Sequence, residues 1–229
     1  MKVALLQHTP EPELTVALAA RLCYSQVDIE ALKEKLSGSD IKNFLDKIMS
    51  LGHQSVLEHA SFTFGVEGIS RVTSHQLVRH RVASYSQQSQ RYVSHKERFA
   101  VVTPPSISGN PKYAAQFEAQ MEALHTAYAK LVEAGVPAED ARYLLPNATE
   151  TKIMLTMNAR ELLHFFAVRC CERAQWEIRE MAVEMLKLVR PVAPTIFVNA
   201  GPGCLGHKCP EGVMSCGKMA KVRKKFRGL

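Results

Sequence analysis

The sequence has 229 residues, of which 46% are hydrophobic and 22% are charged. This length can bury a sizeable core in one large domain or two small ones, and the composition excludes a disulfide-stapled miniprotein and a disordered tail protein. The formal net charge is +7, from 29 Lys and Arg against 22 Asp and Glu. Residues 201–229 hold seven basic residues and one acid, so residues 1–200 carry 22 basic and 21 acidic residues. Because the excess charge lies in the tail, the body of the chain does not predict a nucleic-acid partner.

The amino-terminal segment does not predict a targeting signal. The apolar run within residues 1–8 is too short for a signal peptide, and Pro10, Glu11 and Glu13 follow at once. No uncharged apolar stretch approaches the ~20 residues that a membrane span requires. We therefore expect a cytoplasmic protein without a membrane partner, whose six cysteines are reduced.

The first half of the chain predicts alternating short elements. Residues 1–8 and 61–66 have the pattern of strands, and residues 70–80 that of a helix. Residues 82–92 are polar and lack helical periodicity, which predicts an ordered loop. Three further helices are expected, over residues 12–22, 28–36 and 40–51.

The second half predicts longer helices. After Pro111, apolar residues recur at three- and four-residue steps up to Gly135 and Pro137, namely at Phe117, Met121, Leu124, Tyr128 and Leu131. A strand is expected over residues 152–157, and helices over 159–171 and 175–189, the last with Trp176, Met181, Met185 and Leu188 on its core face. The mixture predicts an α+β fold, a single compact domain over residues 1–200 with a mixed or antiparallel sheet flanked by helices. Residues 201–229 form a Gly/Cys-rich and then basic tail.

Residues 76–92 concentrate the side chains best suited to anion binding. Three arginines, one histidine, three serines and four glutamines occur there with almost no acid. Arginine offers a planar fork of donors for phosphate oxygens, and glutamine both donates to and accepts from a base edge. A short Arg-His-Arg alone is usually a solvated basic loop, but a solvated loop would normally also contain Glu, Asp and Lys. The segment therefore predicts a site for a phosphorylated ligand.

Two clusters of metal-ligand residue types are weaker signals. The spacing of His53, Glu58 and His59 is not that of the zinc hydrolases. Four soft ligands fall within thirteen positions at the start of the tail, but their spacing does not follow the paired zinc pattern. These are Cys204, His207, Cys209 and Cys216. We expect structural thiols and no metal site, with zinc binding as the open alternative; Cys170 and Cys171 are expected to fill the core.

Several motifs together resemble the flavin-dependent thymidylate synthases. Arg79-His80-Arg81, followed after seven residues by Ser89-Gln90-Arg91-Tyr92, is similar to the signature of that family. Residues 52–59 (Gly-His-Gln-Ser-Val-Leu-Glu-His), 141–146 (Ala-Arg-Tyr-Leu-Leu-Pro) and 158–164 (Asn-Ala-Arg-Glu-Leu-Leu-His), with Arg169 five residues on, match in order and spacing. The resemblance is anchored from about residue 50 to residue 176.

The resemblance implies an enzyme that converts dUMP to dTMP. Methylenetetrahydrofolate would donate the carbon and FAD, reduced by NADPH, would carry hydride, in a homotetramer with sites between subunits. The implied dUMP-binding residues are Gln76, Leu77, Val78, Arg79, Gln87, Gln88, Ser89, Gln90, Arg91, Arg142 and Arg169. The implied FAD-binding residues are His53, Ser55, Glu58, Arg79, His80, Arg81, Gln87, Asn158, Ala159, Arg160 and His164.

Arg169 is implied as the catalytic residue, because a fixed guanidinium at the N3–O4 edge of uracil stabilises the negative charge that activates C5. No His/Asp partner is evident for Ser89, so we expect it to bind rather than attack. Three positions depart from the usual pattern of the family: Gln87 stands where many relatives carry Glu, Ser55 replaces Thr, and His164 replaces Asn.

Two other classes of function stay open from the sequence. A noncatalytic nucleotide- or RNA-binding module would use the arginine segment and the basic tail, and a zinc-dependent hydrolase would use the histidine and cysteine clusters. Flavin colour and dUMP-dependent dTMP formation distinguish both from a synthase.

Overall fold

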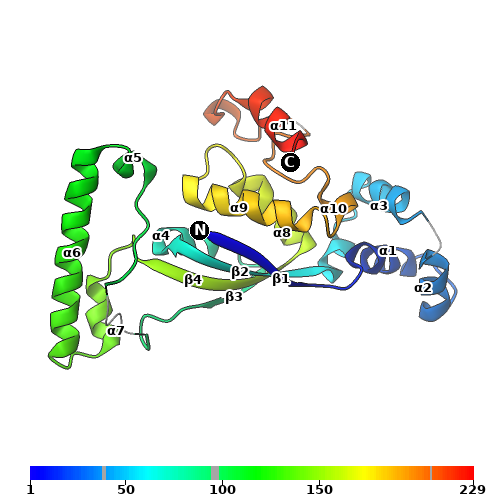
Figure 1. Ribbon diagram of the computed structural model, residues 1–229. Coiled ribbons are helices and arrows are strands. Elements are labelled where there is room, and N and C mark those ends of the chain that lie inside the picture. The colour runs from blue at the N-terminus through cyan, green and yellow to red at the C-terminus, as the bar shows by residue number, and fades with distance from the viewer. Residues whose placement is uncertain (38–39, 94–97, 207) are drawn as a thin grey trace. The chain divides into compact units, whose positions relative to one another are not determined.

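Four strands form one antiparallel sheet in the computed structural model, which describes residues 1–37, 40–93, 98–206 and 208–229 (Figure 1). The strands are β1 (Lys2–His8), β2 (Ser61–Ser70), β3 (Ala83–Gln87) and β4 (Glu150–Asn158), in the spatial order β1-β2-β4-β3. In β2, Phe62, Phe64 and Val66 are buried and their neighbours are less so, as expected for a strand with one face on a core.

The register is visible in pairs of residues along neighbouring strands. The Thr9 amide donates to the Ser61 carbonyl at 2.9 Å, and the Thr63 and Thr156 hydroxyls hydrogen bond at 2.9 Å. The Arg71 amide, just beyond β2, donates to the Thr149 carbonyl at 3.1 Å. Later residues of one strand thus pair with earlier residues of the next, which is the antiparallel pattern.

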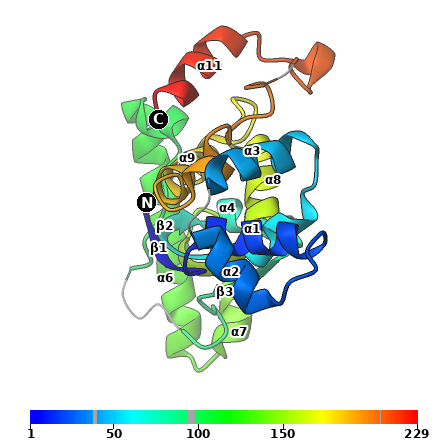
Figure 2. The ribbon, with the colours of Figure 1, turned by 90° about the vertical axis from the view of Figure 1, so that its right-hand side faces the viewer.

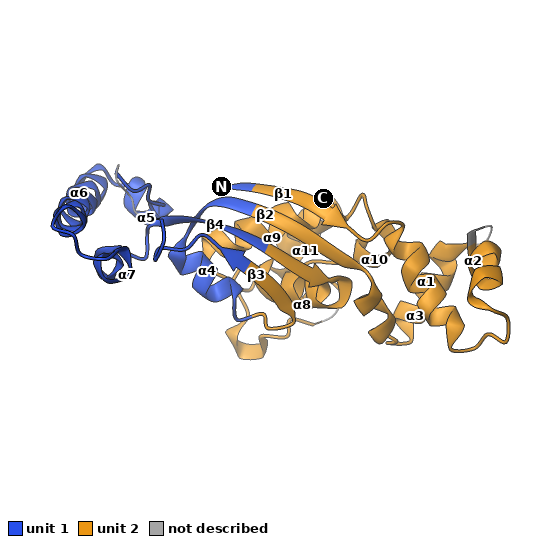
Figure 3. Cartoon of the chain, turned by 90° about the horizontal axis from the view of Figure 1, so that it is seen from below, with its two compact units in different colours: residues 1–2, 66–79, 86–154 blue, residues 3–65, 80–85, 155–229 orange. Residues whose placement is uncertain are grey.

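The described residues group into two compact units (Figure 3). Unit 1 comprises residues 1–2, 66–79 and 86–154, and unit 2 comprises residues 3–65, 80–85 and 155–229. Each unit is described by itself below.

Unit 2 holds most of the helices. They are α1 (Pro12–Leu22), α2 (Ile29–Ser37), α3 (Ile41–Ser50), the 3-10 helices η1 (Ser55–His59) and η3 (Gly212–Met214), α8 (Ala159–Arg169), α9 (Trp176–Val189), α10 (Pro194–Phe197) and α11 (Met219–Arg227). Helix α1 packs on both α2 and α3, and α8 packs beside α9 (Figure 2). Phe62, Phe166 and Phe197 meet edge to face in the core between β2, α8 and α10.

Two charged side chains, Glu13 and Arg190, each make several hydrogen bonds to the backbone of this unit and so act as anchors. The Glu13 carboxylate of α1 accepts from the Thr195 and Ile196 amides and from the Thr195 hydroxyl, at 2.5 to 3.2 Å, and so satisfies the first amides of α10. Arg190, after α9, donates to the carbonyls of Phe197, Ala200 and Phe226 at 2.9 to 3.3 Å. The second anchor holds the carboxyl-terminal helix α11, whose Val222 and Phe226 are buried.

Unit 1 contains α4 (Arg71–Leu77), α5 (Pro105–Ser108), α6 (Pro111–Glu133), α7 (Ala138–Ala141) and the 3-10 helix η2 (Arg142–Leu144). In α6 only Met121 and Tyr128 are buried, although the sequence predicts a continuous apolar face. Phe117, Leu124 and Leu131 are half-buried, and Tyr113 is 53% exposed. Much of the apolar face of α6 is therefore open on the single chain.

The sequence predictions are confirmed for the α+β class, the antiparallel sheet and the long helices. The prediction of a loop over residues 82–92 is wrong in its first half, where β3 forms at the edge of the sheet. Trp176 is half-buried rather than in the core, and Leu188 is also half-buried. Among the described helices, none is long and apolar enough to span a membrane.

Candidate active site

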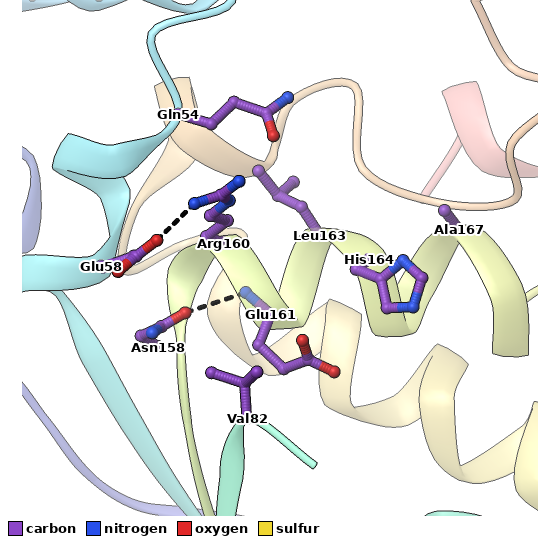
Figure 4. Close-up of a pocket in the computed structure, with 9 residues that line it drawn as sticks. All are labelled: Gln54, Glu58, Val82, Asn158, Arg160, Glu161, Leu163, His164 and Ala167. Atoms are coloured by element: carbon purple, nitrogen blue, oxygen red, sulfur yellow. Dashed lines mark hydrogen bonds and ion pairs between the residues drawn. The ribbon is translucent and has the colours of Figure 1, made fainter. Parts of the chain in front are cut away.

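The turn from β4 into α8 in unit 2 organises the candidate site. Asn158 ends the strand in extended conformation, and its Oδ1 accepts from the Glu161 amide at 2.9 Å, which caps the helix (Figure 4). The first turn of α8 therefore begins at a fixed place, with Arg160 exposed and Glu161 half-buried. Strand and cap together determine where the side chains of α8 point.

An open cavity of about 640 Å³ lies along this face of α8. Glu58 of η1 and Arg160 form an ion pair at its rim, and the side chains between Arg160 and Ala167 follow one side of the helix (Figure 4). The lining residues are Gln54, Glu58, Val82, Asn158, Arg160, Glu161, Leu163, His164 and Ala167. Four of the predicted FAD-binding residues, Glu58, Asn158, Arg160 and His164, are thus brought together from segments a hundred residues apart.

Beside the cavity, three side chains form a relay whose central residue, His80, is buried. His80 Nδ1 lies 3.0 Å from a Glu161 carboxylate oxygen, and Arg169 Nε donates to His80 Nε2 at 3.0 Å. The His80 side chain is 5% exposed and that of Glu161 is 11% exposed. The Tyr85 hydroxyl donates to the His80 carbonyl at 2.8 Å and so holds the backbone of the relay.

These contacts determine the protonation of His80. Because the Arg169 guanidinium only donates, His80 Nε2 must accept, and Nδ1 then carries the proton that faces Glu161. Burial lowers the pKa of His80 below its ordinary value of 6.5, the Glu161 hydrogen bond opposes this, and the Arg169 charge adds to it. Burial also raises the pKa of Tyr85 and lowers that of Arg169. In this relay the neutral imidazole of His80 holds the cationic guanidinium of Arg169 in place.

His80, Glu161 and His164 are also close enough to hold a metal ion. Both ring nitrogens of His80 are already used, however, one by Glu161 and the other by Arg169. A cation at this place would also face the Arg169 charge. The described contacts therefore fit a positioning relay better than a metal centre.

A second group of predicted residues gathers in unit 1. Arg91 donates to the Glu139 carboxylate at 2.7 Å, and Arg142 Nε donates to the Glu139 carbonyl at 3.2 Å. Burial lowers the pKa of Arg71, and the charge of Arg142 lowers it further, which places these two cations near each other. Glu139 thus joins Arg91, through its carboxylate, to Arg142, through its carbonyl, and Arg71 lies near Arg142, so the three guanidinium groups offer donors for a dianion.

The loop after β3 is shaped by its own hydrogen bonds. The Ser89 hydroxyl accepts from the Arg91 amide at 3.1 Å, and the Gln88 amide donates to the Lys152 carbonyl at 3.0 Å. Gln87 donates to the Thr151 hydroxyl at 3.1 Å. These hydrogen bonds of Gln87, Gln88 and Ser89 therefore fix the course of the loop.

The other predicted residues differ in how far they are exposed. Leu77 is fully buried, so a ligand could meet only its backbone, and Ala159 is fully buried with its amide bonded to the Ala60 carbonyl. The side chains of His53, Ser55, Val78, Arg79 and Arg81 are exposed, and those of Gln76 and Gln90 are half-buried.

Sequence reasoning missed several side chains of these groups. They are Gln54, Arg71, Val82, Tyr85, Glu161, Leu163 and Ala167. Glu161 lies inside the predicted motif of residues 158–164. It stands three residues after Asn158, the spacing of a helix-capping pair, and that pattern could have identified it. Arg71 carries no motif and could not have been found.

Comparisons with known proteins identify the family of the chain. Residues 4–195 match the family described as thymidylate synthase complementing protein. A protein of Geobacter sulfurreducens named flavin-dependent thymidylate synthase is 69% identical over 228 residues, which cover 99% of this chain and 98% of that protein. Proteins of the same name from Clostridium tetani and Pyrococcus horikoshii are 50% and 43% identical, over 98% and 100% of this chain and 96% and 98% of theirs. The chain belongs to the family of flavin-dependent thymidylate synthases.

Proposed function

We propose that this chain is a flavoenzyme that converts dUMP to dTMP, with methylenetetrahydrofolate as carbon donor and FAD reduced by NADPH. Membership of the family supports the reaction, because the relatives carry its name over nearly their full length. The observation that carries the proposal is the relay from Glu161 through His80 to Arg169, beside the cavity of α8.

The residues along α8 fit a flavin nucleotide. A volume of about 640 Å³ is within the usual range for cofactor sites. Arg160 and the amino end of α8 favour phosphate oxygens, while Leu163 and Ala167 offer apolar surface for a ring system. When bound, FAD supplies hydride for reduction of the transferred carbon. Glu58, Asn158, Arg160 and His164 would hold it, with His53, Ser55, Arg79, Arg81 and Gln87 as further predicted contacts.

Arg169 would act on the pyrimidine. A guanidinium at the N3–O4 edge of uracil stabilises negative charge there, so that electron density at C5 becomes available for bond formation. His80 would not touch the substrate in this scheme; it would hold Arg169 Nε and so orient the guanidinium. Glu161 would keep His80 in the required tautomer.

The arginine cluster of unit 1 would bind the nucleotide phosphate. Arg91 and Arg142 were expected there from the resemblance, and Arg71 adds a third cation. Gln87, Gln88, Ser89 and Gln90 would line the nucleotide with amide and hydroxyl groups. In the single chain the Glu139 carboxylate forms an ion pair with Arg91, and a phosphate dianion would compete with Glu139 for that guanidinium.

We also propose a cytoplasmic homotetramer with sites shared between subunits. The apolar face of α6 supports assembly. In a single chain Tyr113 is exposed to water, and Met121 and Tyr128 are the buried residues of the helix. Residues from different chains could then complete each site.

A direct assay tests the proposed reaction. The purified protein should be yellow, or become yellow with added FAD, and should form dTMP from dUMP, methylenetetrahydrofolate and NADPH. Arg169→Lys keeps the charge but loses the planar fork, and we expect a fall in kcat of about 100-fold or more. Arg21→Lys is the matched control, because Arg21 stacks on the Phe44 ring of α3 and belongs to neither group; its kcat should be unchanged.

The possible outcomes separate the parts of the proposal. A colourless protein that forms no dTMP would reject the function. Normal turnover of Arg169→Lys, with dTMP formed by the unaltered protein, would reject only the role of Arg169.

A further inference from the structure

Four cysteines of unit 2 line one small cavity behind α8. Cys171, Cys204, Cys209 and Cys216 all border a space of about 20 Å³, and all four are free thiols. Cys204 is buried and the other three are half-buried. The sequence drew attention to the last three but placed Cys171 in the core. His207, which the sequence grouped with them, lies outside the described residues.

The four thiols border the same cavity but are spread around it. No three of their sulfur atoms lie within 4.8 Å of one another, so a bound ion would draw the side chains inward. Cys170, by contrast, is 1% exposed and does not border the cavity among the described residues.

The backbone around the cavity is held in place from several sides. The Gly203 amide donates to the Ala167 carbonyl of α8 at 3.2 Å, and Arg223 Nε of α11 donates to the Cys204 carbonyl at 2.9 Å. The Arg173 guanidinium donates to the Met214 carbonyl. Among the described residues of 198–218, the short η3 is the regular structure, so side-chain contacts must supply most of the order of this segment.

We propose that Cys171, Cys204, Cys209 and Cys216 bind one zinc ion. Thiolates are the preferred soft ligands of zinc, and four protein ligands make a closed structural site rather than a catalytic one. The cavity has room for about one small ion. Zinc would join the end of α8, through Cys171, to the segment before α11.

The local charge favours such a centre. Zinc with four thiolates carries a net charge of −2, and the Arg223 guanidinium of α11 donates to the Cys204 carbonyl beside it. Glu172 and Glu211 also border the cavity, but each is within 3.6 Å of an arginine, Arg179 and Arg173 respectively. The positive charge of the tail thus has a use that requires no nucleic acid.

The site lies behind the candidate active site. Ala167 lines both the α8 cavity and the cysteine cavity, and Arg169 lies two residues before Cys171. Zinc would therefore stabilise the end of α8 that carries Arg169, without taking part in the chemistry.

Metal analysis of the full-length protein, purified under reducing conditions, tests the proposal. We expect about one zinc per chain. Cys209→Ser and Cys216→Ser should each lower the zinc content several-fold, while Cys23→Ser, at an exposed cysteine on another part of the unit, should leave it unchanged. Replacement of zinc by cobalt should give the intense thiolate-to-metal absorption of a tetrahedral site.

A second measurement uses the unaltered protein and so does not depend on the folding of a variant. In the zinc-loaded protein a thiol reagent should react quickly with Cys23, and addition of a chelator should release up to four more reactive thiols. A metal-free protein with no cobalt absorption would overturn the proposal, as would disulfides among these cysteines in place of zinc. Zinc retained fully by Cys209→Ser and Cys216→Ser together would also overturn it.

Discussion

His80 is the side chain on which the candidate site depends most. Its two ring nitrogens connect a carboxylate, Glu161, to the guanidinium of Arg169, and its carbonyl is held by Tyr85. A protonated His80 could not accept from Arg169 and would repel it. The neutral state is therefore part of the geometry, and the burial that lowers the His80 pKa protects it.

This arrangement predicts a loss of stability in acid. The folded-state pKa of His80 lies below its ordinary value of 6.5, so the unfolded chain binds a proton below pH 6.5 that the folded chain refuses. The contribution of His80 is fully present above pH 6.5 and is lost as the pH falls toward the folded-state pKa. When the unfolding free energy is plotted against pH, His80 contributes at most about 1.4 kcal/mol per pH unit to the slope.

Denaturant unfolding on either side of pH 6.5 measures this share. His80→Gln keeps hydrogen-bonding groups but cannot take up the proton, so its stability should change less with pH than that of the unaltered protein. His53→Gln, at an exposed histidine, is the control and should leave the slope unchanged. Equal slopes for all three proteins would contradict the prediction.

For single residues, the sequence predicted which residues belong to the site better than it predicted which of them contact one another. The Arg79–Arg81 motif pointed to His80, but its contacts with Glu161 and Arg169 join positions 81 and 89 residues apart. No local pattern encodes such a pairing, which depends on how β4 and α8 fold. Cys171 was placed in the core for the same reason, since the segment that faces it begins more than thirty residues later.

Among the elements, β3 shows where sequence patterns fail. Ser84, Tyr85 and Ser86 lack an apolar face, so the segment resembles a loop. As an edge strand it is held by backbone pairing on one side and needs little side-chain burial. The strands β2 and β4 were found because their alternating apolar residues enter the core.

Arg190 is one of the contacts that hold helix α11 in place. Arg190 satisfies three carbonyl groups, one of them at Phe226 near the end of α11. Arg190→Lys retains the charge but cannot reach three carbonyls with one ammonium, so we expect a loss of about 3 kcal/mol in unfolding free energy. Amide hydrogen exchange should show faster exchange in Met219–Arg227.

Lys187→Ala is the matched control for this prediction. Its exposed ion pair with Glu184 on α9 is expected to contribute at most about 0.5 kcal/mol. If Arg190→Lys were no less stable than Lys187→Ala, the anchor would carry little of the stability of the tail.

For the whole molecule, the proposed tetramer follows from the open face of α6. Tyr113→Glu places a charge on that face and should shift the mass measured by light scattering from four chains to fewer. Ala115→Glu adds the same charge at an exposed position on the opposite side of the helix and should leave the assembly intact. A single-chain mass for the unaltered protein would reject the tetramer.

The cap of α8 restricts the ligand in a way that follows from hydrogen-bond polarity alone. Asn158 uses its amide oxygen to hold the Glu161 amide, so the group it can offer to the cavity is its NH2. A ligand atom bound to this NH2 must therefore be an acceptor, such as a phosphate or carbonyl oxygen. The residue that starts the helix thus also selects the chemical character of what lies beside it.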